Sequence, residues 1–240
     1  MIDGVYIALI EILFFIFIST GIKIVYKQFN DINIITYFWL MFTILTGIWE
    51  SAFILNYNNS TELSKELILK NEHVWTNKYD LTYLNPYKFS IIFYSEYGSY
   101  ADRDYMITSN DWSRVIESSH ALLCGLFALF CIICKINSNN KNYLICLSVS
   151  MGSQLMNSVL YMINYFIQCN TYNNVNYNNN SFPTGKYLEQ RPFMYINIFW
   201  TIMPLYIIMI LLVNNKIIKI KNNNNNNNKT TIIKLNEINK

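Results

Sequence analysis

Apolar positions in this chain gather into runs of about 20 residues, which is the length a helix needs to cross a bilayer. The runs are Val5 to Val25, Ile34 to Leu55, Ser113 to Cys134, Tyr143 to Ile167 and Phe193 to Val213. The first run lacks a basic leader and a small-residue cleavage site, so we interpret it as a span and not as a signal peptide. The pattern predicts an all-α, polytopic membrane protein, a bundle of five transmembrane helices.

The connections between these runs differ in length and charge. Residues 26–33 and 135–142 are short and carry lysines, whereas 56–110 and 170–191 are long and rich in Asn and Tyr. The tail 214–240 again carries lysines. Because positive residues favour the cytosolic side, both short loops and the tail are expected there, with the amino terminus and both long loops on the lumenal side.

Three regions follow from this pattern. Residues 1–33 form the first helix and a cytosolic loop, 34–213 form a four-helix region with the long lumenal loop 56–110, and 214–240 form a tail. Low-complexity Asn segments are expected to be disordered. These segments are the Asn/Lys-rich tail with Asn222 to Asn228, and the clusters around Asn58 and Asn173. Glycosylation is left open at the sequons that begin at Asn58, Asn59 and Asn179.

Composition agrees with a membrane protein and narrows the chemistry. Hydrophobic residues make up 52% of the 240 residues and charged residues only 14%, with a net charge of +3. The lysines are scattered or flank apolar runs, which argues against nucleic-acid binding. Most of the five cysteines lie in apolar runs, where a thiol is a small hydrophobe. Cys131 and Cys134 have CxxC spacing without a second pair, so no metal, disulfide framework or cofactor is expected.

Ionisable residues inside the predicted spans need an explanation. An acidic or basic residue at a helix centre costs about 2.5–3.5 kcal/mol, so such residues usually face the bundle interior and mark a site. Glu50, Glu117 and His120 are the residues of this kind. Glu11 stands alone on its helix and is expected to be a packing or interfacial residue.

Three of the predicted helices carry polar or aromatic pairs one turn apart. The pairs are Thr46 and Glu50, Glu117 and His120, and Asn197 and Trp200. Residues three or four apart share a helix face, so each pair projects into one space. A structural interpretation is that Glu117 pairs with His120 and that Asn197 makes an interhelical hydrogen bond.

The functional interpretation is a shared cavity with acid–base chemistry. Low dielectric drives the pKa values of two neighbouring carboxylates up and apart, so that one can act as acid and the other as base. A Trp face stabilises a cation. Together these groups suit proton-in, proton-out movement of a double bond in an apolar substrate such as a sterol.

Five quoted segments carry a resemblance to a known family. In chain order they are "GIWESAFIL", "SEYGSYADRDY", "VIESSHALLCGLFALF", "NSVLYMINYF" and "RPFMYINIFWTIMPL". Their order resembles the emopamil-binding protein family, the sterol delta-8 to delta-7 isomerases, within the EXPERA superfamily that includes the sigma-2 receptor. The likeness covers residues 34–213, and the acidic segment is nearer to the emopamil-binding-like paralogue.

The resemblance implies a multi-pass endoplasmic-reticulum protein that acts on a sterol within the lipid bilayer, with a homodimer left open. It implies catalytic roles for Glu50, Glu117 and His120, and substrate-binding roles for the remaining matched residues. These are Thr46, Trp49, Tyr161, Asn197 and Trp200.

The chain departs from the family pattern at two of these positions. Family isomerases carry a His where Thr46 stands and a Thr where His120 stands. If the two positions adjoin in space, an imidazole stays near both carboxylates and the chain is expected to be an isomerase. Otherwise it is expected to be a non-catalytic sterol-binding protein. A proton-coupled carrier is disfavoured because five spans give no inverted repeat.

Overall fold

The computed structural model describes residues 1–102, 112–170 and 192–213. Within this part, five helices are long and apolar enough to cross a membrane, which confirms the predicted all-α fold and its five spans. They are α1 (Gly4–Val25), α2 (Ile34–Lys70), the Val115–Ile136 helix, α6 (Asn140–Asn170) and the C-terminal helix (Phe193–Val213). The third of these combines the end of η4 (Trp112–Glu117) with α5 (Ser118–Ile136).

Shorter elements lie between these helices. They are β1 (Ile2–Asp3), η1 (Lys27–Asp31), β2 (Lys78–Tyr79), η2 (Leu81–Leu84), α3 (Pro86–Glu96) and η3 (Tyr97–Ala101). β1 and β2 pair antiparallel, with Ile2 opposite Tyr79. The Asn173 cluster, the Asn179 sequon and the tail 214–240 with Asn222 to Asn228 lie outside the described residues.

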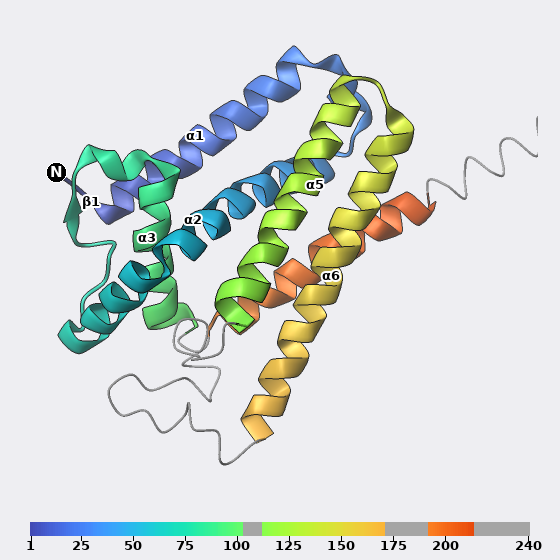
Figure 1. The fold of residues 1–240 in the computed structure, drawn as a ribbon. Coiled ribbons are helices and arrows are strands. Elements are labelled where there is room, and N and C mark those ends of the chain that lie inside the picture. The colour runs from blue at the N-terminus through green and yellow to red at the C-terminus, as the bar shows by residue number, and fades with distance from the viewer. Residues whose placement is uncertain (103–111, 171–191, 214–240) are drawn as a thin grey trace, which may run out of the picture.

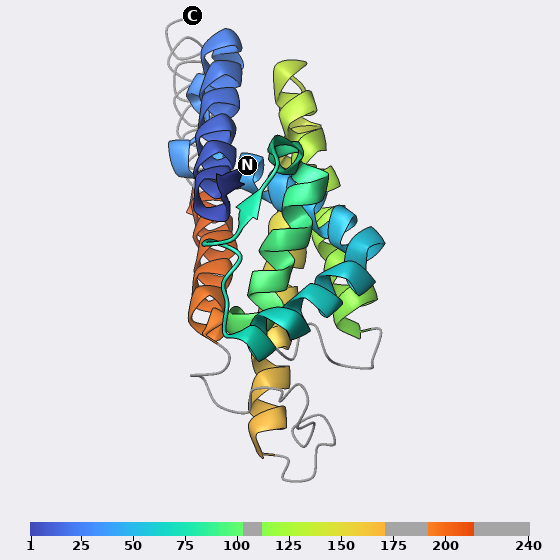
Figure 2. The same cartoon turned by 90° about the vertical axis from the view of Figure 1, so that its left-hand side faces the viewer.

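The centre of the bundle is α2, which packs against α5 on one side and α3 on the other, while α6 packs against α5 (Figure 1). α3 and the β1–β2 pair form a layer at the side that Figure 2 turns toward the viewer. α1 lies at the edge and leaves large apolar side chains such as Leu13 and Phe17 exposed. Exposed apolar surface of this extent is expected where a helix faces lipid.

α2 and α5 approach each other at two glycines. A Cβ on Gly47 would lie 3.0 Å from the Cα of Gly125, and a Cβ on Gly125 would lie equally close to the Cα of Gly47. Small residues allow helix backbones to come this close in a membrane. The crossing therefore sets Thr46 and Glu50 on α2 beside the segment of α5 that carries His120.

α2 is longer than the apolar run that predicts it. It has 37 residues, or about 55 Å at 1.5 Å per residue, whereas the hydrocarbon core is about 30 Å thick. Its last four turns leave the predicted span and include Asn58 and Asn59, which corrects the expectation that this cluster is disordered. The predicted lumenal loop 56–110 is thus largely helical where the structure describes it.

Serine residues at every fourth position join the extension of α2 to α3 and η3. Ser64 Oγ donates to the carbonyl of Ser95 at 2.9 Å, and Ser95 Oγ lies 3.1 Å from the carbonyl of Ser60. Ser99 Oγ continues the series to the carbonyl of Ser64 at 3.1 Å. These small side chains let the two helices pack closely, which explains why a polar sequence stays helical here.

Side-chain caps fix where two of the helices begin. The Asn33 side chain accepts from the backbone N–H groups of Ile35 and Thr36 at the start of α2. Asn85 accepts from the N–H of Tyr87 at the start of α3, where Pro86 occupies the first position. Such caps satisfy N–H groups that the first helical turn leaves without partners.

Candidate functional site

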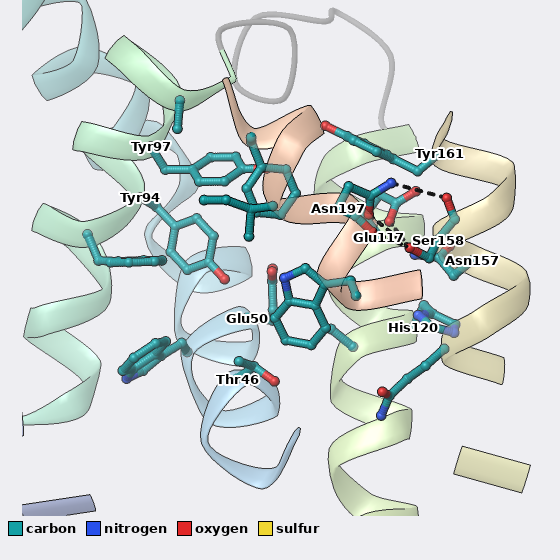
Figure 3. A pocket seen from close by; sticks show the side chains of 18 of the residues that line it. Thr46, Glu50, Tyr94, Tyr97, Glu117, His120, Asn157, Ser158, Tyr161 and Asn197 are labelled. Carbon is teal, nitrogen blue, oxygen red and sulfur yellow. Dashed lines mark hydrogen bonds between the residues drawn. The ribbon is translucent and has the colours of Figure 1, made fainter. Parts of the chain in front are cut away.

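A cavity of about 370 Å³ lies between α2, α3, α5, α6 and the C-terminal helix. Small-molecule sites usually fall between about 300 and 1,000 Å³. Its lining includes all eight residues that the sequence assigns to the site, on four helices (Figure 3). These residues are Thr46, Trp49, Glu50, Glu117, His120, Tyr161, Asn197 and Trp200. The structure therefore brings the expected residues together, and their roles stay predictions.

Glu117 reaches the cavity from the junction between η4 and α5. Its side chain is largely buried, and Oε2 accepts a hydrogen bond from Nδ2 of Asn157 on α6 at 2.7 Å. A hydrogen bond to a carboxylate inside a low-dielectric bundle is stronger than one between neutral groups. Asn157 therefore fixes the orientation of Glu117.

His120 lies one turn further along α5 and also turns toward α6. Its Nε2 lies 2.8 Å from Ser153 Oγ and 3.1 Å from the Ser153 carbonyl oxygen, and Cys124 Sγ lies 3.4 Å away. The hydrogen bonds of the imidazole thus go to Ser153 and Cys124. The structural interpretation in which Glu117 and His120 pair with each other is wrong, because α6 supplies a separate partner to each.

Asn197 on the C-terminal helix bonds to α6 in the same way. Its Oδ1 accepts from Ser158 Oγ at 2.9 Å, and its Nδ2 donates to the Ser158 carbonyl at 3.2 Å. Thr201 Oγ1 lies 2.8 Å from the same Ser158 hydroxyl. The interhelical hydrogen bond expected of Asn197 is confirmed, and the same side chain lines the cavity.

Glu50 and Thr46 form the α2 side of the cavity. Figure 3 shows them across from Glu117 and His120, with the hydroxyl of Tyr94 on α3 turned toward Glu50. Thr46 Oγ1 donates to the carbonyl of Thr43 at 3.1 Å, within its own helix. The cavity thus has one carboxylate on α2 and, across from it, one at the junction of η4 and α5.

Gln154 ties this side of α2 to α6. Its Oε1 accepts from Nε1 of Trp39 at 3.0 Å, and its Nε2 donates to Thr43 Oγ1 at 3.1 Å. Both ends of the amide are therefore satisfied inside the bundle, which keeps α6 in register with α2.

Aromatic rings supply much of the remaining lining. Trp200 stacks on Phe42 with ring centroids 5.5 Å apart and planes 25° apart, and Trp39 lies 5.0 Å from Trp200. Trp49 contacts Phe93 of α3 at 5.1 Å. Tyr161 at the far end of α6 donates a hydrogen bond to the buried carboxylate of Asp102. Such a site can hold an apolar ligand between two carboxylates.

Fifteen of the 23 described lining residues were not assigned to the site from the sequence, and four of them carry a carboxamide, carboxylate or indole side chain. They are Trp75, Glu96, Gln154 and Asn157. Gln154 and Asn157 are polar side chains in a predicted span, a signal that could have identified them. Trp75 and Glu96 fall in the region predicted to be a loop, where neither periodicity nor burial could be inferred.

Residues outside the cavity behave as structural groups. Glu11 is buried on α1 without lining the cavity, in agreement with the expected packing role. The thiols of Cys131, Cys134 and Cys146 are free, as is that of Cys124, which does line the cavity. No group of three or more His, Cys, Asp or Glu residues in the described ranges is arranged to hold a metal ion.

No protein-family profile matches the chain, and neither the curated proteins nor the solved structures contain a significant match.

Proposed function

We propose that this protein is an intramembrane sterol isomerase that moves a ring double bond from the delta-8 to the delta-7 position, in the endoplasmic-reticulum membrane. The observation that carries the proposal is the pair of carboxylates, Glu50 on α2 and Glu117 at the junction of η4 and α5, that line one cavity within the apolar spans. The sequence resemblance described above points to the same reaction.

The proposed reaction needs one acid and one base. The protonated member of the glutamate pair transfers its proton to C9 of the alkene, and the electron pair of the double bond forms the new C–H bond. This leaves a cation at C8. The ionised member removes a proton from C7, and the released electron pair closes the C7–C8 double bond. One proton enters and one leaves, so the substrate formula is unchanged.

Other lining groups support the cation and the protons. The ring face of Trp200, held by its stack on Phe42, is suited to stabilising the positive charge. His120 is placed to relay or tune protons, with its ring held by Ser153. In this proposal the protein needs no metal or organic cofactor.

The decisive test is expression in a yeast that lacks its own delta-8 isomerase, followed by sterol profiling. We expect delta-7 sterols to return with the wild-type chain and to be lost with Glu50→Gln or Glu117→Gln. Glu11→Gln is the matched control, because Glu11 is also a buried glutamate in a span but does not line the cavity. Persistent delta-8 sterols with well-expressed wild-type protein would reject the isomerase.

A second candidate function is sterol binding without catalysis. It is favoured by one observation, namely that the hydrogen bonds of the His120 imidazole go to Ser153 and Cys124, and that none goes to a carboxylate of the described residues. A protein of this kind would bind a radiolabelled delta-8 sterol in nanodiscs and release it unchanged.

The exchange of Thr and His between positions 46 and 120 separates the two candidates further. Both side chains line the same cavity. If an imidazole is needed anywhere in the cavity, the double variant Thr46→His/His120→Thr should retain more isomerase activity than His120→Thr alone. Equal loss in both variants would show that the anchored position on α5 is required.

A further inference from the structure

Segment 71–77, which joins α2 to β2, lies outside the five spans yet places Trp75 in the cavity wall. The chain reverses at Asn71, which caps α2 in the left-handed conformation with φ of 52°. Asn tolerates this conformation better than most residues. The N–H of Glu72 then donates to the carbonyl of Leu67 at 3.0 Å, and this hydrogen bond fixes the start of the turn.

The start of α1 holds the same segment from the other side. The N–H of Val5 donates to the carbonyl of Trp75 at 3.0 Å, and the N–H of Gly4 donates to the carbonyl of Asn77 at 2.9 Å. A Cβ on Gly4 would lie 2.2 Å from the carbonyl oxygen of Val74, so only glycine fits at this contact. The backbone around Trp75 is therefore pressed against α1.

Glu96, at the end of α3, completes the attachment. Its buried carboxylate accepts from the N–H of Val74 at 3.0 Å through Oε2, and Oε1 lies 2.6 Å from Nδ1 of His73. The ring of Tyr100 lies against that of His73, with centroids 4.1 Å apart and planes tilted by 32°, and its hydroxyl donates to the carbonyl of Glu72 at 2.8 Å. Both oxygens of Glu96 are thus committed to segment 71–77, although the residue lines the cavity.

We infer that segment 71–77 closes one end of the cavity, that Trp75 sets the length of ligand that fits there, and that Glu96 is the positioning residue that holds Trp75 in place. Besides its bonds to the end of α2, the segment makes hydrogen bonds with α1, α3 and η3, which fix the backbone of Trp75 from several directions.

The surroundings of Trp75 indicate which part of a ligand meets it. Three hydrogen-bonded polar side chains, Glu117, Asn157 and Asn197, gather on the side of the cavity formed by the Val115–Ile136 helix, α6 and the C-terminal helix. Glu96, the acidic lining residue near Trp75, instead directs both oxygens to segment 71–77. Trp75 packs with the aromatic cluster that includes Trp49 and Phe93. A ligand with a polar and an apolar end would therefore direct its apolar end toward Trp75. For a sterol, this apolar end is the alkyl side chain, an assignment that rests on the proposed function.

The test compares sterols that share one ring system and differ only in alkyl side-chain length. Each would compete with a radiolabelled delta-8 sterol for the full-length protein in nanodiscs. We expect Trp75→Ala to shift the affinity ratio of longer to shorter sterols by about tenfold or more, since loss of the indole leaves space that a longer alkyl chain can fill. Glu96→Ala should shift the ratio in the same direction, and Glu96→Gln, which can still accept from Val74, should restore most of it.

Two further variants separate positioning from general damage. Tyr83→Ala removes an aromatic ring from the same layer at a site that does not line the cavity, and should leave the ratio unchanged. Adding Glu96→Ala to Trp75→Ala should cause no further shift, because both would act through the same indole. Additive shifts, or a ratio that Trp75→Ala does not move, would overturn the inference.

Cys124 provides a readout that needs no ligand, because this thiol lines the cavity. A charged methanethiosulfonate reagent should modify Cys124 about tenfold faster in Trp75→Ala and Glu96→Ala than in the wild type or Tyr83→Ala, as followed by mass spectrometry. Equal rates in all four proteins would refute closure by this segment. If the wild-type protein binds sterol without isomerising it, the isomerase proposal alone is refuted. If the wild-type protein binds no sterol, the selection of sterols by side-chain length is refuted.

Discussion

At the scale of single residues, three polar side chains of the candidate site form hydrogen bonds with α6. The hydrogen bonds join Asn157 to Glu117, Ser153 to His120 and Ser158 to Asn197. A polar group without a hydrogen-bond partner in a bilayer costs several kcal/mol. Because α6 supplies hydrogen-bonding side chains, the neighbouring helices can carry ionisable side chains at a lower cost. α6 is therefore the scaffold of the site as much as one of its walls.

Under the proposed isomerase function, this arrangement predicts that Asn157→Ala impairs turnover more than sterol binding. A hydrogen bond to a charged group contributes about 1.5–3 kcal/mol, so kcat should fall about tenfold or more when Glu117 loses its described partner. Sterol turnover and binding would be measured on the same nanodisc sample. Asn164→Ala, which removes an exposed amide from the same helix, is the control and should match the wild type. Equal behaviour of the two variants would contradict the role of Asn157.

The site residues were predictable to the extent that they violate the hydropathy of a span. Glu50, Glu117 and His120 are conspicuous in an apolar run, and helical spacing then supplies Thr46, Asn197 and Trp200. Asn157 could not be assigned because its role depends on which carboxylate it faces. Trp75 and Glu96 depend on a chain reversal at Asn71 that returns the segment to the cavity, and no local pattern encodes that.

At the scale of elements, hydropathy located all five spans but not the true end of α2. The apolar run stops at Leu55, and Asn56 to Lys70 is polar enough to be taken for a loop. Helix formation continues because Ser60 and Ser64 pack against α3. Tertiary contacts thus extend α2 beyond the apolar run that predicts its membrane span. The same contacts bring α3 to the cavity.

The crossing of α2 and α5 predicts a strong effect of adding a single methyl group. Gly47→Ala would place a Cβ 3.0 Å from the Gly125 backbone, and forcing the helices apart should destabilise the protein by about 1–3 kcal/mol. Gly152→Ala on α6 is the matched control, because its Cβ would meet no atom within 4 Å, and the better helix propensity of alanine should make it neutral or slightly stabilising. Thermal unfolding of both variants in detergent would measure the difference. A Gly47→Ala protein as stable as the control would show that the helices are free to separate.

At the scale of the whole molecule, the arrangement of the ends agrees with one orientation in the membrane. The two short connections, η1 and residues 137–139, lie at one end of the bundle together with the last turn of the C-terminal helix (Figure 1). Lys23 and Lys135 are at this end. β1, β2 and α3 lie toward the other end, where segment 71–77 meets the cavity. Because lysines beside short connections favour the cytosolic side, we expect the end with Lys23 and Lys135 to face the cytosol.

This orientation predicts opposite labelling of two introduced cysteines. In a background without the native cysteines, Asn137→Cys lies in the short α5–α6 connection, and Leu81→Cys lies in η2 at a position that is 64% exposed. A membrane-impermeant maleimide added to sealed microsomes, whose outer face is cytosolic, should label Asn137→Cys and leave Leu81→Cys unmodified. Detergent should then expose both, which controls for reactivity. The reverse pattern would invert the topology, and would place segment 71–77 and the end of the cavity that it closes on the cytosolic side.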